Sequence, residues 1–192
     1  MLFVFKGRAK IVLAYFISGL YICILSGEIN AFVMNTLDLT YTETTRFVAP
    51  FLEELLKSIP VFVYAYVFKP KRQILIQCAV AVGVGFALIE NIRILINFSE
   101  SMSVVVCIYR GLGAALMHGI STFIYAALAN YFISKDKYYA LGLIFSLIFA
   151  CLYHGLYNCL ISSRFQYFGI LVPVLTFILL LVFSKNQVKL LF

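Results

Sequence analysis

Long apolar stretches separated by short polar segments occupy almost the whole chain. An apolar helix must run for about 20 residues to cross some 30 Å of hydrocarbon at 1.5 Å per residue. Stretches that meet this length predict helices near residues 10–27, 46–68, 73–97, 103–133, 138–161 and 165–184. The longest segment between them covers about residues 28–45. The pattern predicts an all-α, polytopic transmembrane bundle with about six spanning helices.

The composition supports a membrane protein. Hydrophobic residues make up 64% of the 192 residues, charged residues 12%, and the mean hydropathy is +1.02. A soluble domain has about half apolar and a quarter charged residues. We therefore expect one transmembrane domain over residues 1–192 in a multi-pass protein of the cell membrane. No A-x-A-like cleavage site follows the first apolar run, so we expect that run to be a retained helix and not a signal peptide.

Charged residues outside the apolar stretches are distributed unevenly. Basic residues gather at the two ends of the chain and in two connections: Lys6, Arg8, Lys10, Lys69, Lys71, Arg72, Lys135, Lys137, Lys185 and Lys189. The alternate connections carry Glu28, Asp38, Glu43 and Glu100, with Arg46 and Arg164 near helix ends. The positive-inside rule then predicts that both termini are cytosolic. Because the clusters flank spans, the net charge of +7 does not indicate a nucleic-acid partner.

Polar residues inside the apolar helices are the candidate functional residues. They are Glu53-Glu54-x-x-Lys57, Glu90-Asn91, Arg110, His118 and His154-x-x-x-Asn158, and they include both histidines of the chain. One ionisable side chain at the bilayer centre costs roughly 2.5–3.5 kcal/mol on insertion scales. Several such groups together predict a functional site within the membrane.

The first group places two acids and a base on one helix. Lys57 follows Glu53 by four residues and Glu54 by three, so its ammonium can reach either carboxylate. A single Lys neutralises a single Glu, which leaves the second carboxylate without a partner. Adjacent residues on a helix also point about 100° apart, so the two acids can serve different roles.

The next groups lie on the third and fourth predicted helices. Ala79, Gly83 and Ala87 recur at four-residue spacing, a pattern that favours close helix packing and would hold Glu90 firmly against a neighbouring helix. Arg110 lies two helical turns before His118. We interpret Arg110 as a structural counter-ion, either to Glu90 or to a glutamate of the second helix.

His154 and Asn158 are one turn apart and share a helix face. One ring nitrogen of a histidine can bind a metal while the other is oriented by a neighbouring group, and an asparagine amide can donate to an oxyanion. Several of the groups lie about seven or eight residues from the predicted outer helix ends, or roughly 11 Å; these are Glu53, Glu90, Arg110 and His154. His118 lies deeper. The depths predict one shared site in the outer half of the membrane.

Taken in order, these motifs resemble those of the PrsW-like intramembrane proteases, which are similar to the wider group of CAAX-prenyl endopeptidases and bacteriocin-processing membrane proteases. The resemblance covers about residues 47–158, within a motif-bearing core at about 46–161. It implies hydrolysis of peptide bonds within or beside the membrane. Glu53 and Glu54 match the paired glutamates of the family, His118 and His154 its histidines, and Asn158 the polar residue after the last histidine.

Hydrolysis needs an activated water and a stabilised oxyanion. We expect His118, His154 and one glutamate, taken as Glu54, to hold a divalent metal, most simply zinc, with the other glutamate as general base. Asn158 would polarise the scissile carbonyl, and Lys57, Glu90, Asn91 and Arg110 would support the site. The sequence does not decide which glutamate is the ligand, and it leaves open a metal-free site in which glutamate and histidine activate water directly.

Two other readings use the same residues. The buried Glu, Arg and His side chains could form the proton relay of a small proton- or ion-coupled transporter, although no paired halves with broken helices are visible. Haem ligated by His118 and His154 would leave the glutamates unexplained. The expected partners of a protease are a membrane-anchored protein substrate and the bilayer. The sequence leaves the substrate, the metal and the oligomeric state open.

Overall fold

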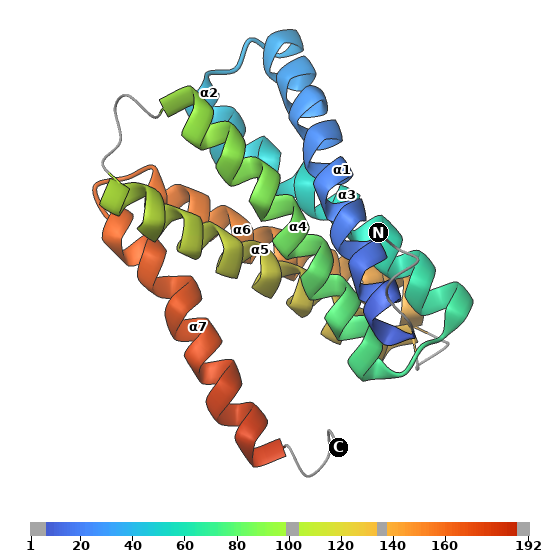
Figure 1. Ribbon diagram of the computed structural model, residues 1–192. Helices are drawn as coiled ribbons and strands as arrows, with labels where there is room; N and C mark the ends of the chain where they lie inside the picture. The colour runs from blue at the N-terminus through green and yellow to red at the C-terminus, as the bar shows by residue number, and fades with distance from the viewer. Residues whose placement is uncertain (1–6, 99–103, 134–137, 188–192) are drawn as a thin grey trace.

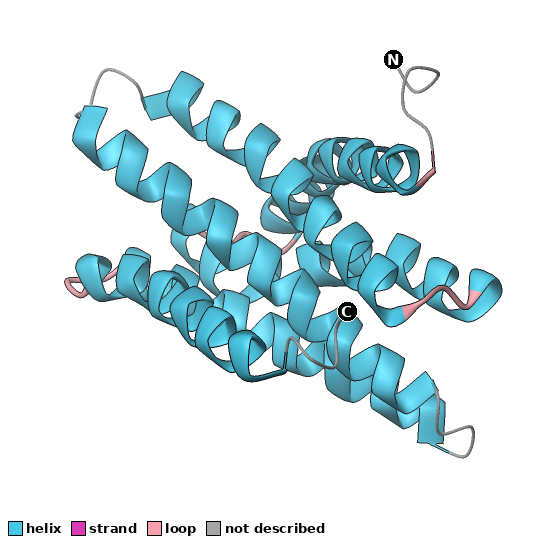
Figure 2. Ribbon diagram, turned by 60° about the horizontal axis from the view of Figure 1, so that its bottom comes forward, coloured by secondary structure: helices cyan, strands magenta, loops and turns pink. Residues whose placement is uncertain are grey.

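The computed structural model describes residues 7–98, 104–133 and 138–187, and this part of the chain is helical throughout, with short connections (Figures 1 and 2). The long helices are α1 (Arg8–Thr36), α3 (Ala49–Val63), α4 (Arg72–Phe98), α5 (Val104–Ile133), α6 (Tyr139–Ile161) and α7 (Gln166–Gln187). A short helix, α2 (Tyr41–Glu43), and a π-helical segment, Thr44–Val48, lead into α3, and a second π-helical segment, Tyr64–Phe68, follows it. The prediction of an all-α fold is confirmed.

Five helices of the described chain, α1 and α4 to α7, are long and apolar enough to cross a membrane. The second predicted span, residues 46–68, is the exception. Its α-helical part is α3, which has 15 residues and carries Glu53, Glu54 and Lys57. The described chain thus has five helices with the length and apolarity of a membrane span, where the sequence predicted about six. The remaining helix, α3, is short and bears the charges of the site.

The first predicted span, residues 10–27, was too short. Helix α1 continues to Thr36, so most of the expected loop at 28–45 is helical. No Gly or Pro interrupts residues 28–36, which explains why the helix does not end there. The chain turns only after Leu37 and enters α2 through a capping box, in which the Thr40 side chain and Glu43 satisfy each other's backbone N–H groups.

Helix packing places α3 among the other helices. Helix α4 packs against α1 and α5, α5 also packs against α6 and α7, and α3 contacts α1, α5 and α6. Helix α7 lies at one edge of the bundle, beside α5 and α6 (Figure 1). The face of α3 that carries Glu53, Glu54 and Lys57 is therefore buried against the neighbouring helices.

Small residues bring the helices close, as the stripe around Gly83 predicted. A Cβ atom added at Gly83 would lie 2.3 Å from the carbonyl oxygen of His118, and one added at Gly85 would lie 2.1 Å from that of Phe16. The backbone of α4 thus touches α5 on one side and α1 on the other. This contact fixes α4 against His118, a residue of the candidate site.

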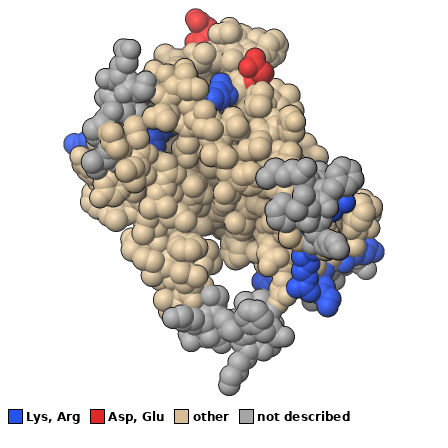
Figure 3. All heavy atoms as spheres, in the orientation of Figure 1, with Lys and Arg blue, Asp and Glu red and all other residues tan. Residues whose placement is uncertain are grey.

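Charged side chains are sparse on the face shown in Figure 3, with acidic spheres at the end where α1 meets α2 and a basic group near the α3–α4 connection. Lys69, Lys71 and Arg72 of that connection are exposed. Some residues of the charge argument lie outside the described residues: Lys6, Glu100, Lys135, Lys137 and Lys189. The cytosolic placement of both termini stays a prediction.

The contact at Gly83 gives a stability prediction. Gly83→Ala should lower the free energy of unfolding by about 1–3 kcal/mol, because the new methyl group forces α4 away from α5. Gly119→Ala is the matched control on α5, since its Cβ would meet only side-chain carbons at 3.7 Å or more. Thermal unfolding in detergent measures both. Equal midpoints for the two variants would contradict the close contact.

Candidate active site

The polar groups of four helices meet in one buried cluster. It consists of Glu53, Glu54 and Lys57 from α3, Glu90 from α4, His118 from α5, and His154 and Asn158 from α6. These side chains come from four different helices, so the cluster forms only when the helices pack together. The prediction that residues far apart in the sequence share one site is consistent with this geometry.

Glu54 is the centre of the hydrogen-bond network. Its Oε1 atom accepts from Lys57 Nζ at 2.5 Å, from His154 Nδ1 at 2.8 Å and from Ser121 Oγ at 3.0 Å. The Glu54 side chain is 1% exposed. Lys57 could have reached either glutamate from the sequence, and the structure pairs it with Glu54.

Lys57 also fixes the orientation of His118. Its Nζ atom lies 2.8 Å from His118 Nδ1, and because an ammonium can only donate, this ring nitrogen is the acceptor. The proton of the neutral ring is then on Nε2, which lies 2.9 Å from Glu90 Oε2 and donates to it. Lys57 also lies 4.6 Å from the centre of the Phe86 ring, a cation–π contact. The ammonium is fully buried and has polar and aromatic partners.

His154 has the opposite tautomer. Its Nδ1–H donates to Glu54, which leaves a lone pair on Nε2. Asn158 Nδ2 lies 3.2 Å from that nitrogen and 2.9 Å from the carbonyl oxygen of Thr45, so its two N–H groups can serve both acceptors. Thr45 belongs to the π-helical segment before α3, and π-helical turns are frequent at functional sites.

Glu53 has an oxygen that no described residue satisfies. Its Oε1 accepts from Asn30 Nδ2 of α1 at 3.2 Å, while its Oε2 is buried without a hydrogen-bond partner. That Oε2 lies 3.9 Å from His154 Nε2, too far for a direct hydrogen bond. A buried carboxylate oxygen without a donor is costly. Its surroundings therefore suit a water or a cation that lies between the two residues.

The residues fit a divalent metal. Glu53, His118 and His154 each offer one ligand atom, and these atoms lie within 4.8 Å of one another. Two histidines and one carboxylate are a common catalytic zinc set. The predicted set contained Glu54 in place of Glu53; Glu54 instead accepts three hydrogen bonds and orients His154. To bind a metal through Nε2, neutral His118 would have to carry its proton on Nδ1 instead, so that Nδ1 would no longer accept from Lys57.

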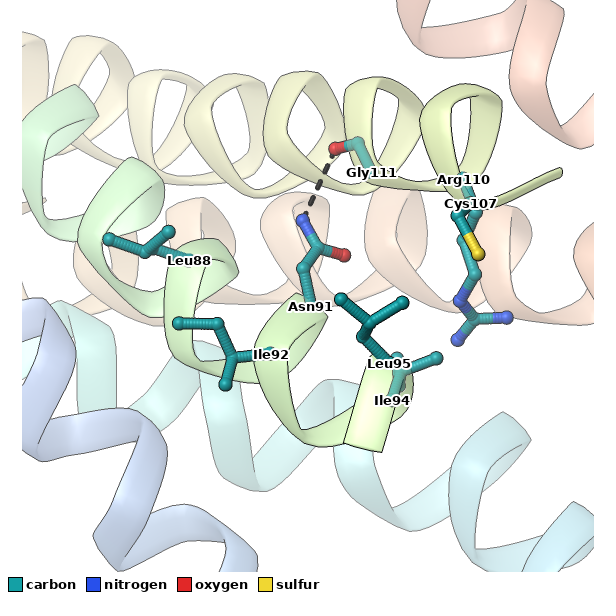
Figure 4. Close-up of a pocket in the computed structure, with 8 residues that line it drawn as sticks. All are labelled: Leu88, Asn91, Ile92, Ile94, Leu95, Cys107, Arg110 and Gly111. Atoms are coloured by element: carbon teal, nitrogen blue, oxygen red, sulfur yellow. Dashed lines mark hydrogen bonds between the residues drawn. The ribbon is translucent and has the colours of Figure 1, made fainter. Parts of the chain in front are cut away.

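Asn91 and Arg110 lie beside the cluster and not in it. Asn91 Nδ2 donates to the carbonyl oxygen of Gly111 at 3.2 Å and so ties α4 to α5 (Figure 4). Within the described part of the chain, Arg110 forms no ion pair, and its Nε is buried without a hydrogen-bond partner. Its interpretation as a structural counter-ion to Glu90 or to a glutamate of the second predicted helix therefore stays a prediction; Arg110 lies within electrostatic range of Glu90 without a direct ion pair. Both residues line a cavity.

Sequence reasoning missed three contributors. Asn30 fell in the segment predicted as a loop, Ser121 is an unremarkable serine of an apolar helix, and Thr45 acts through its backbone. Ser121 follows His118 by three residues and so shares its helix face, a signal that was available. The other two depend on the extension of α1 and on the π-helical turn.

Comparison with models of known families matches residues 7–184 to the family described as PrsW family intramembrane metalloprotease. No curated protein and no solved structure matches the chain.

The network gives a prediction for Lys57. Lys57→Met should destabilise the protein by about 3–5 kcal/mol, because Glu54 then keeps a buried charge without its cation. The double variant Glu54→Gln/Lys57→Met should recover part of this loss, since neither charge remains. Unfolding in detergent and sodium dodecyl sulfate measures the cycle. Additive effects of the two substitutions would show that the pair is not coupled.

Proposed function

Because the chain belongs to the PrsW family of intramembrane metalloproteases, we propose that it hydrolyses peptide bonds of membrane-anchored protein substrates at the cluster around Glu53, His118 and His154. One observation carries the proposal. The Oε2 atom of Glu53 is buried, has no donor among the described residues and faces the Nε2 lone pair of His154. This is the arrangement that a hydrolytic water requires.

Glu53 and His154 hold and activate the attacking water. A water beside the 3.9 Å gap can hydrogen-bond to both Glu53 Oε2 and His154 Nε2. Glu53 takes the proton of this water as the oxygen attacks the scissile carbonyl, and later delivers it to the leaving amine. Glu54 does not exchange protons in this scheme. It keeps the His154 ring in the tautomer that presents Nε2.

In the metal-dependent form of the proposal, Glu53, His118 and His154 would instead hold a divalent metal, which would supply Lewis acidity and lower the pKa of a bound water. Zinc suits a set of two histidines and one carboxylate. Glu54 would orient the His154 ring from behind, since it accepts from Nδ1 of that ring.

Asn158 stabilises the oxyanion. One N–H of its amide is held by the Thr45 carbonyl, and the other points to His154 Nε2. When Nε2 takes a water or another ligand, the second N–H becomes available to the carbonyl oxygen of the substrate. The Thr45 bond keeps the amide in place meanwhile. A donor fixed before the reaction costs no reorganisation during it.

The remaining parts of the proposal concern the protein as a whole. We place it in the cell membrane as a multi-pass protein of one helical domain, with the active site in the outer half of the bilayer. The family match favours a protease over the proton- or ion-coupled transporter that the sequence also allowed.

Loss of the water-activating carboxylate should abolish catalysis. We expect Glu53→Gln to reduce cleavage at least about 100-fold, the scale of general acid–base catalysis, and Asn158→Ala to reduce it about 10²- to 10³-fold. The assay incubates purified protein in detergent with a mixture of transmembrane peptides and identifies new termini by mass spectrometry. Glu28→Gln and Asn97→Ala are the matched controls, because both side chains are exposed. Cleavage by Glu53→Gln at the wild-type rate would refute the mechanism.

The metal content of variants distinguishes the ligand set with Glu53 from the predicted set with Glu54. We expect about one zinc per wild-type chain and its loss in Glu53→Gln and His154→Ala. Glu54→Gln should bind zinc with about 10- to 100-fold lower affinity, the usual effect of losing a group that orients a ligand. Elemental analysis of the purified variants measures this. Zinc retained in Glu53→Gln but lost in Glu54→Gln would restore the set predicted from the sequence, and a metal-free active wild type would favour direct activation by Glu53 and His154.

A further inference from the structure

A small cavity lies between the second half of α4 and the first half of α5, next to the active site (Figure 4). Its volume is about 160 Å³. The wall is apolar except for the Asn91 amide and the guanidinium of Arg110; the lining residues are Leu88, Asn91, Ile92, Ile94, Leu95, Cys107, Arg110 and Gly111. The Asn91 amide is already bonded to Gly111. Arg110 is therefore the polar group that the cavity offers to a ligand.

Among the described residues, Arg110 has no ion pair, and its Nε has no hydrogen-bond acceptor. This Nε is buried, and a cation in an apolar membrane helix is costly unless paired. Outside the cavity lining, the buried Tyr157 hydroxyl also lacks a hydrogen-bond partner. Glu90 is within electrostatic range of Arg110, but its Oε2 is held by His118. The unpaired Nε of Arg110, in a cavity wall that is otherwise mostly apolar, favours an anionic oxygen group.

We propose that this cavity is a specificity subsite that binds the carboxylate of an Asp or Glu side chain of the substrate. The inference rests on the proposed function and adds to it the kind of residue that the substrate carries near the cleavage site. Cavities for drug-sized ligands are about 300–1,000 Å³. The smaller volume here suits one side chain better than a lipid or a cofactor.

The position of Arg110 relative to His118 sets the distance to the scissile bond. Eight residues of helix separate them, or about 12 Å at 1.5 Å per residue. An extended peptide advances about 3.3 Å per residue, and the long Arg side chain shortens the path further. The acidic residue is therefore expected about two to four residues from the bond that is cut.

The test is the binding of peptides that differ by one charge. A panel of fluorescent apolar peptides of about 20 residues carries a single Glu at successive positions, and each has a partner with Gln at the same position. Fluorescence anisotropy measures binding to the Glu53→Gln protein in detergent, so that cleavage does not consume the probe. At one or two positions Glu should bind at least about tenfold more tightly than Gln, which is the scale of a charge-assisted hydrogen bond.

Variants of Arg110 test whether this residue causes the preference for Glu. In the Glu53→Gln background, Arg110→Gln should bring the Glu/Gln affinity ratio near one, and Arg110→Lys should keep part of the preference because the charge remains. Arg93→Gln removes an exposed arginine of α4 outside the cavity and should leave the ratio unchanged. A ratio near one at every position, or a preference that persists in Arg110→Gln, overturns the proposal.

The same peptides, incubated with wild-type protein, separate this inference from the proposed function. Cleavage two to four residues from the preferred Glu supports both. Preference in binding without any cleavage supports the subsite and counts against the protease. Cleavage without a preference in binding counts against the subsite alone.

Discussion

The buried ammonium of Lys57 constrains the whole active site. Because this side chain is fully buried among apolar helices, its charge must be compensated by neighbouring protein groups. Lys57 donates to Glu54 on one side and to His118 on the other. These two bonds set the tautomer of His118 and occupy the Glu54 oxygen that also accepts from His154. The two histidines are thereby placed in opposite tautomers by one cation and its counter-ion.

This electrostatic network depends on close helix packing. Glu90 reaches His118 because Gly83 lets the α4 backbone touch the α5 backbone at that residue. The ring of Phe86, on the same helix, packs 4.8 Å from the ring of His118 and also contacts the Lys57 ammonium. A larger residue at position 83 would move a carboxylate, an aromatic ring and a histidine together. Small residues in α4 thus support the active site by setting the distance between α4 and α5.

The sequence predicted the class of fold, which follows from composition, and it singled out most of the polar residues that lie together in the cluster, because polar groups in apolar helices are costly. It could not predict which glutamate faces which histidine. Glu53 and Glu54 are adjacent, so their directions depend on the rotation of α3 between α1 and α6, which no local pattern encodes. The same holds for Arg110, because a choice between Glu90 and a glutamate of α3 as its counter-ion depends on both the helix spacing and the side-chain direction. Asn30 was missed because α1 runs nine residues beyond the predicted span.

Buried polar atoms that lack partners lie around this network and are of two kinds. Asn30 Oδ1 and Glu53 Oε2 are acceptors on the α1 and α3 side, while Arg110 Nε and the Tyr157 hydroxyl are donors on the α5 and α6 side. Each costs about 1–3 kcal/mol while it stays unsatisfied. An extended polypeptide presents N–H and C=O groups along its length and can serve both kinds at once. Part of the free energy lost in folding around these atoms can then be recovered on binding a substrate, which favours a peptide over an apolar lipid chain.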